Sequence, residues 1–213
     1  MIVHPDNRVI VAAPATYSQK NILQFVEKKA DWIRKAIQAN LQRGRQCHEK
    51  TFQTGDKLLY LGREYILRVE RGNAPQVILG DEDICVRLRV EGAGPEPSAV
   101  KEHLLGWYHA RALAKVKEKV TLYAGLIGVN PRFVVLKSLK SRWGSCSIHG
   151  RISLAWNIIM APEAVLDYLI VHELCHMVHH NHSAAYWRLV QSVLPDHRER
   201  RLWLRQHGER LTF

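Results

Sequence analysis

The spacing of hydrophobic positions changes several times along the chain, and each change predicts a different kind of element. An apolar run at residues 9–13 predicts a short strand. From Ile22 to Ile37, apolar residues then recur every three or four positions, which is the spacing of an amphipathic helix. Ser18 precedes this stretch as a candidate N-cap, and Gly44 follows as its candidate end. Further strands are predicted at residues 58–61, 64–69, 76–79 and 84–90, with glycine-containing turns between them.

The segment 91–97 divides the pattern in two, because its two glycines and two prolines end regular structure on both sides. A helix is predicted beyond it at residues 98–124, with a buried face of Leu104, Trp107, Tyr108, Leu113, Val116 and Val120. Strands are expected at 133–136 and 151–156, and helices at 163–178 and 184–193. This order predicts an α+β fold with a small strand-rich N-terminal region, residues 1–92, and a second domain, residues 98–213.

Composition and charge restrict the class of protein. No apolar run among the 213 residues approaches the roughly 20 needed to span a bilayer, so no membrane partner is expected. The four cysteines, Cys47, Cys85, Cys146 and Cys175, are far apart and form no disulfide framework, which favours the reducing cytoplasm. The formal net charge of +11 would attract nucleic acid, but the basic residues are spread along the chain rather than gathered in one block.

The strongest chemical signal is the pattern His-Glu-x-x-His at residues 172–176, inside a predicted helix. Residues four apart lie on one face of a helix, so His172 and His176 can reach one ion. Glu173 lies beside them and can take a proton from water that the ion activates. A helix that merely carries polar residues on its outer face could show the same short pattern.

A third ligand makes the metal interpretation stronger, because catalytic zinc usually takes three protein ligands. His180 lies two helical turns from His172, roughly 12 Å along a helix, which is too far for one ion. His182 becomes possible if the helix ends near His179 and the chain folds back. We therefore predict Zn²⁺ bound by His172, His176 and His182, and place His179 and His180 outside the ligand set.

The sequence Ser-Arg-Trp-Gly-Ser-Cys-Ser at residues 141–147 has two interpretations. It is either a substrate-facing loop or edge strand, in which Gly144 allows close backbone approach, or a β-turn packed on Trp143. The first makes Arg142, Trp143 and Gly144 candidate substrate-binding residues, together with Tyr186. Tyr186, His197 and Arg142 are also candidates for stabilising an oxyanion. Cys146 and Cys175 are interpreted as small packing residues.

These motifs resemble those of the YgjP-like metallopeptidase family, which is related to the SprT-like and minimal zincin proteases. The resemblance rests on residues 140–147, 167–176, 181–183, 186–187 and 203–205, and on shorter matches at 13–14, 28–33 and 60–62. It implies a zincin-like C-terminal core built around an active-site helix. It also implies that His172, His176 and His182 are the ligands and that Glu173 is the catalytic base.

The function predicted is therefore a zinc-dependent hydrolase, a metallopeptidase acting on a peptide or protein substrate. Three alternatives compete with it. The first is metal-dependent nucleoside-triphosphate pyrophosphatase activity, for example on UTP, although Mg²⁺ phosphate chemistry prefers carboxylate oxygens to imidazoles. The second is a nucleic-acid-associated protease or binding module that uses the basic surface. The third is an inactive scaffold, which the intact ligand pattern and Glu173 argue against.

Overall fold

A computed structural model describes residues 1–3, 7–14, 16–44, 50–89, 94–139 and 142–213 of the chain. These residues form two compact units, Met1–Glu49 and Lys50–Phe213. The predicted boundary at residues 92–98 lies within the second unit, and residues 92 and 93 are outside the described part. The strands before that boundary and the helix after it share one hydrophobic core, in which Leu67 and Ile84 are as fully buried as Leu104 and Tyr108. The compact units therefore divide the chain earlier than the predicted domains do.

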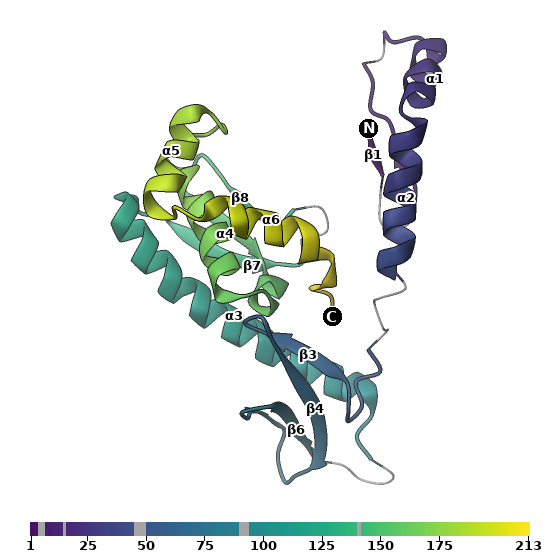
Figure 1. Cartoon of the computed structure of the whole chain (residues 1–213). Helices are drawn as coiled ribbons and strands as arrows, with labels where there is room; N and C mark the ends of the chain where they lie inside the picture. The colour runs from purple at the N-terminus through teal and green to yellow at the C-terminus, as the bar shows by residue number, and fades with distance from the viewer. Residues whose placement is uncertain (4–6, 15, 45–49, 90–93, 140–141) are drawn as a thin grey trace. The chain divides into compact units, whose positions relative to one another are not determined.

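The first unit contains two short strands and two helices (Figure 1). Strands β1 (Ile2–Val3) and β2 (Val9–Ile10) pair antiparallel, so the strand predicted at residues 9–13 is shorter than expected. The predicted helical stretch is divided at Lys29 into α1 (Gln19–Lys28) and α2 (Ala30–Gly44). The Ser18 cap is confirmed, because its side-chain oxygen accepts a hydrogen bond from the Asn21 amide.

The second unit begins with a four-stranded sheet in the order β3-β4-β6-β5. Its strands, all predicted, are β3 (Lys57–Tyr60), β4 (Arg63–Arg71), β5 (Gln76–Leu79) and β6 (Asp83–Leu88). The β3–β4 turn places Gly62 at a φ of 80°, where a Cβ atom would lie 2.8 Å from the Pro162 Cα atom. The Gly62 amide also donates to the Met160 carbonyl. Only glycine fits this contact, which holds the sheet against the segment leading into α4.

The rest of the second unit is helical, with one small sheet. Helix α3 (Pro97–Ile127) extends the predicted helix at both ends, and Leu113, expected to be buried, is 36% exposed. A three-stranded sheet in the order β7-β9-β8 follows, with β7 and β9 parallel and β8 and β9 antiparallel. Its strands and the remaining helices are β7 (Phe133–Lys137), β8 (Gly144–Cys146), β9 (Arg151–Ala155), α4 (Glu163–Cys175), α5 (Ala184–Val193) and α6 (His197–His207). Short 3-10 helices at Trp156–Met160 and Gly208–Arg210 complete it.

This is the mixed α+β arrangement that the sequence predicts, but two helices differ from expectation. Helix α4 ends at Cys175, three residues before its predicted end. Helix α6 has no counterpart among the predicted elements. No helix in the described ranges combines the length and apolar character needed to cross a membrane.

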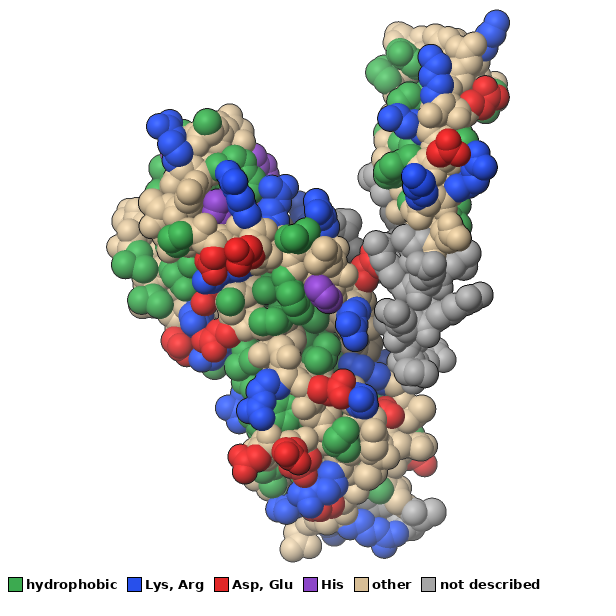
Figure 2. Space-filling view, viewed as in Figure 1, with side chains coloured by type: hydrophobic (Ala, Val, Ile, Leu, Met, Phe, Trp, Pro, Cys, Tyr) green, Lys and Arg blue, Asp and Glu red, His purple; other side chains and the backbone are tan. Residues whose placement is uncertain are grey.

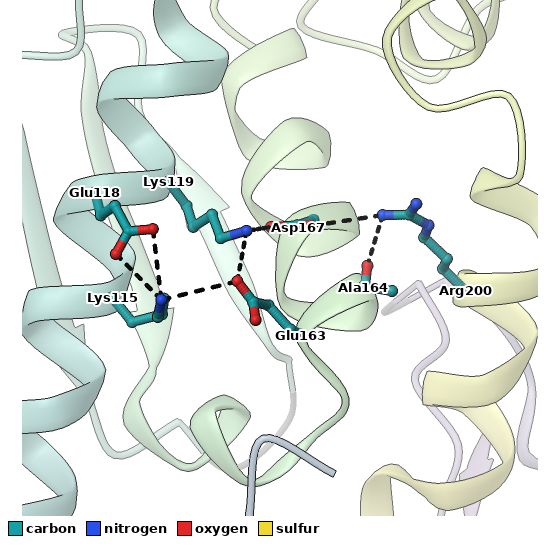
Figure 3. A network of polar contacts seen from close by, with 7 residues as sticks. All are labelled: Lys115, Glu118, Lys119, Glu163, Ala164, Asp167 and Arg200. Atoms are coloured by element: carbon teal, nitrogen blue, oxygen red, sulfur yellow. Dashed lines mark hydrogen bonds and ion pairs between the residues drawn. The ribbon is translucent and has the colours of Figure 1, made fainter.

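Helix α4 is buried on nearly every side, as expected for a helix in the middle of a core. Its N-terminal half is also held by charge (Figure 3). The Lys119 ammonium of α3 lies 2.6 Å from Glu163 and 3.1 Å from Asp167, two carboxylates one turn apart on α4. From α6, Arg200 donates to the Ala164 carbonyl and lies 3.9 Å from Asp167. Helices α3 and α6 therefore both fix the position of α4.

Candidate metal centre

Three histidines meet where α4 ends. His172, in the last turn of α4, and His176, the C-cap residue of that helix, have ring centroids 4.9 Å apart. Beyond Cys175 the amides of Val178 and His179 both donate to the Cys175 carbonyl, and the chain turns back before α5 begins. This reversal brings the His182 ring to 5.1 Å from His172 and 4.7 Å from His176. His180 is not among the three histidines whose ring nitrogens converge in the described part of the chain.

The hydrogen bonds from His179 and Tyr186 engage the same nitrogen, Nδ1, of His176 and His172 respectively. The Nδ1 atom of His176 lies 3.1 Å from the His179 carbonyl, which can only accept, so Nδ1 carries the proton. The Nδ1 atom of His172 lies 2.6 Å from the Tyr186 hydroxyl oxygen. In both rings Nε2 is therefore the atom available to a metal ion.

The arrangement fits zinc by distance and by donor chemistry. The Nε2 atoms of His172 and His182 are 3.3 Å apart, and one potential ligand atom from each of the three histidines lies within 4.8 Å of the others. Two nitrogens bound at about 2.05 Å in a tetrahedral zinc site would be about 3.3–3.4 Å apart. Burial, with the nearby His176 and His182, lowers the pKa of His172 to about 3, and burial also lowers the pKa of His176. Both rings are therefore neutral at pH 7, as metal ligands must be.

Glu173 is buried beside this cluster, with only 4% of its surface exposed. Burial raises the pKa of its carboxyl group to about 7, and the charge of Arg142 opposes that rise. The side chain lies directly against β8, because a Cβ atom on Gly144 would be 2.9 Å from the Glu173 Cδ atom. The close approach anticipated at Gly144 is thus an approach by Glu173, and it requires the absence of a side chain at residue 144.

The other predicted site residues differ in how far they are exposed to solvent. Arg142 is exposed, whereas Trp143 is half-buried and packs on Gly208, where a Cβ atom would lie 2.8 Å from the indole ring. Tyr186 is fully buried and faces the histidines rather than an open surface. His197 is buried too, with its Nδ1 atom 3.2 Å from the Leu194 carbonyl. Of these four side chains, Arg142 alone is exposed.

Two residues outside the predicted set flank the histidines. The Trp187 ring stacks on His182 with centroids 5.6 Å apart. The Arg201 guanidinium lies 4.9 Å over the Trp187 ring, and its charge contributes to lowering the pKa of His172. Figure 2 shows Lys and Arg side chains close to histidines on the face in view. No signal in local spacing pointed to Arg201, because its helix was not predicted.

The two cysteines near the site behave as packing residues. Cys175 is fully buried, and burial raises its pKa to about 12. Burial and the neighbouring Glu173 raise the pKa of Cys146 to about 11. Both thiols are therefore protonated at neutral pH, whereas a nucleophile or a zinc ligand would be a thiolate.

Comparison with known proteins gives one family match. The family described as YgjP-like, metallopeptidase domain, matches residues 1–207 of the chain. Among solved structures, the metallopeptidase zymogen abylysin of Pyrococcus abyssi aligns with 24% identity and a TM-score of 0.40. That alignment covers 44% of this chain and 93% of the other, and it is too weak to support an argument. No curated protein matches the chain.

Proposed function

Because the chain belongs to the YgjP-like metallopeptidase family, we propose that it is a zinc-dependent peptidase. In this proposal the ion is held by three histidines, His172, His176 and His182. The main support for this proposal is that the ring nitrogens of the three histidines converge. The Nε2 atoms of His172 and His182 lie at the spacing expected in a tetrahedral zinc site. Three imidazole ligands suit zinc better than magnesium or calcium, which prefer oxygen ligands.

Glu173 acts as the general base in this proposal. A zinc ion held by three imidazoles supplies a Lewis acid that polarises a carbonyl and lowers the pKa of water. The Glu173 carboxylate takes the proton from the attacking water and passes it to the leaving amine. Its burial supports this role, because a carboxyl group with a pKa of about 7 can both accept and return a proton near neutral pH.

The substrate is proposed to be an extended peptide that lies along β8. This strand is at the edge of its three-stranded sheet, and Gly144 in it touches Glu173. A peptide added to an exposed edge is held by main-chain hydrogen bonds. Its scissile carbonyl would then lie beside the general base. Arg142, exposed just before β8, is the predicted substrate-binding residue whose placement suits a contact with the peptide.

A nucleic-acid partner is a second proposal, supported by α6. Arg198, Arg201 and Arg205 are all exposed and lie on one face of this helix at spacings of three and four residues. Such a stripe can contact successive phosphates. Binding to DNA that weakens steeply as salt rises, and that weakens further when the three arginines are replaced by glutamine, would support it. A salt-independent affinity would contradict it.

The pyrophosphatase alternative has less support from the site. Magnesium phosphate chemistry relies on carboxylate oxygens, whereas the candidate metal cluster found among the described residues consists of three histidines. The cytoplasmic location also remains a proposal. It rests on the cysteines, of which Cys85, Cys146 and Cys175 are free in the structure.

The ligand set is tested by metal analysis of purified protein. Wild type should hold about one zinc per chain. His182→Ala should lose most of this zinc, whereas His180→Ala, two residues away and outside the converging group, should keep it. Full zinc retention in His182→Ala would refute the proposed site. Wild type should hydrolyse unfolded protein and leave UTP intact, and the reverse result would favour the pyrophosphatase.

A further inference from the structure

Tyr186 touches all three histidines of the candidate centre. Its ring stacks on His176 at 4.7 Å and meets His172 and His182 edge-on at 5.5 and 4.9 Å. The side chain is fully buried in α5, and its amide donates to Ser183, the N-cap of that helix. Ser183 follows His182 directly in the chain, so Tyr186 links the segment that carries His182 to α4.

The Tyr186 hydroxyl makes two hydrogen bonds to one residue. It lies 2.6 Å from the His172 Nδ1 atom and donates to the His172 carbonyl at 3.0 Å. A phenol has one proton, and the carbonyl can only accept it. The Nδ1 atom must therefore carry its own proton and donate it to the phenol oxygen. This pairing selects one tautomer of His172 and directs its Nε2 lone pair toward His182.

We propose that Tyr186 is the positioning residue of the metal centre, which orients His172 through its hydroxyl and packs the three rings through its aromatic face. This inference rests on the proposed zinc site. Tyr186 acts on the ligand and does not touch the substrate. Its burial supports this role over the substrate-binding or oxyanion role anticipated for it from the sequence. Groups that orient ligand histidines contribute about 10- to 100-fold to metal affinity in other proteins.

Tyr168 offers a matched control. It is also a buried tyrosine, 4% exposed, and its ring lies 5.7 Å from that of His172. In the described residues, the hydroxyl hydrogen-bonded to His172 is that of Tyr186. Tyr186→Phe and Tyr168→Phe each remove the hydroxyl of a buried tyrosine whose ring lies beside His172. The two variants differ because the hydroxyl lost from Tyr186 is hydrogen-bonded to the His172 imidazole.

The experiment measures zinc affinity by competition with a chromophoric chelator, using the full chain. Tyr186→Phe should weaken zinc binding about 10- to 100-fold, and Tyr168→Phe should change it less than about threefold. A purely structural role for Tyr186 would instead lower the melting temperature of the zinc-free protein and leave the affinity of the folded protein intact. Equal zinc affinities in the two variants would overturn the proposal.

A second measurement uses the wild-type protein without zinc and therefore does not depend on either variant folding. Nitrogen-15 NMR of the His172 ring should show the tautomer protonated at Nδ1. A ring protonated at Nε2 would overturn the proposal, even if zinc binds. If the wild type binds no zinc but shows the Nδ1 tautomer, the zinc function fails, whereas the orientation of His172 by Tyr186 stands.

Discussion

The two ends of α4 each bury an acidic side chain, but in opposite surroundings. Asp167, 9% exposed, has the Lys119 ammonium at 3.1 Å and Arg200 at 3.9 Å (Figure 3). Glu173, 4% exposed, lies six residues later among histidines and the backbone of β8. The positive charge that acts on Glu173 comes from Arg142, which is exposed to solvent.

This difference separates a charge-paired acid from an acid without a close cationic partner on the same helix. Desolvation of a carboxylate is costly, and at Asp167 two bases offset the cost. Burial would lower the pKa of Lys119, but its interactions with Glu163 and Asp167 outweigh burial and raise that pKa to about 12, so Lys119 is a cation. At Glu173 the cost is offset only in part, by the charge of exposed Arg142, and burial raises the pKa to about 7. One end of α4 therefore stabilises the fold, and the other holds a group suited to proton transfer.

The largest expected effect comes from Glu173→Gln. It keeps the shape of the side chain but removes the basic oxygen, so turnover should fall at least ~100-fold. Zinc content and melting temperature should remain nearly unchanged. Peptidase assays, metal analysis and thermal unfolding measure the three quantities. Asp167→Asn is the reciprocal control, because it should lower the melting temperature and keep the activity of the folded protein. A Glu173→Gln variant that retains full activity would disprove the general-base role.

A smaller loss of activity is expected for Gly144→Ala. The added Cβ would lie 2.9 Å from the Glu173 Cδ and Cγ atoms, so either the carboxylate or β8 must move. A displacement approaching 1 Å in a catalytic group can cost up to about 100-fold in rate, and we expect a loss of about 10- to 100-fold. Gly106→Ala, in α3, is the control, because its Cβ would meet no atom within 4 Å. Equal activity in both variants would show that the contact between Gly144 and Glu173 does not matter.

Stability rather than activity should change in Lys119→Ala. The substitution removes the nearest base from Asp167 and Glu163, and should cost about 2 kcal/mol of unfolding free energy in a denaturant titration. That is below the roughly 3–5 kcal/mol for breaking a buried pair completely, since Arg200 still faces Asp167. Lys117→Ala, on an exposed face of the same helix, should have little effect.

The stability effect of Lys119→Ala should also depend on pH. The hydrogen bond from Lys119 lowers the pKa of Glu163 in the folded protein. The stability that this ion pair contributes is therefore fully present above the pKa that Glu163 has in the unfolded chain, and it is lost as pH falls through the lower pKa of the folded protein. The gap between wild type and Lys119→Ala should therefore narrow below about pH 4. A gap that widens in acid would show that this network is not stabilised by ionised carboxylates.

The sequence by itself determined the features that depend on near neighbours along the chain. The apolar spacing predicted the strands of residues 57–88 and helices α3 and α5, because one buried face imposes a local period. The four-residue interval between His172 and His176 placed both on one face of α4. The distance argument against His180 directed attention to His182, which the structure does bring to the other two histidines.

Tertiary structure alone decided which groups surround those histidines. The contact between Gly144 and Glu173 depends on how β8 packs against α4, and the hydrogen bonds of Tyr186 to His172 depend on how α5 folds back. The approach of Arg200 to Asp167 depends on α6, a helix that was not among the predicted elements. These contacts join residues that are far apart in the chain. A periodic hydrophobic pattern shows which face of a helix or strand is buried, but it does not show which residue of another element contacts that face.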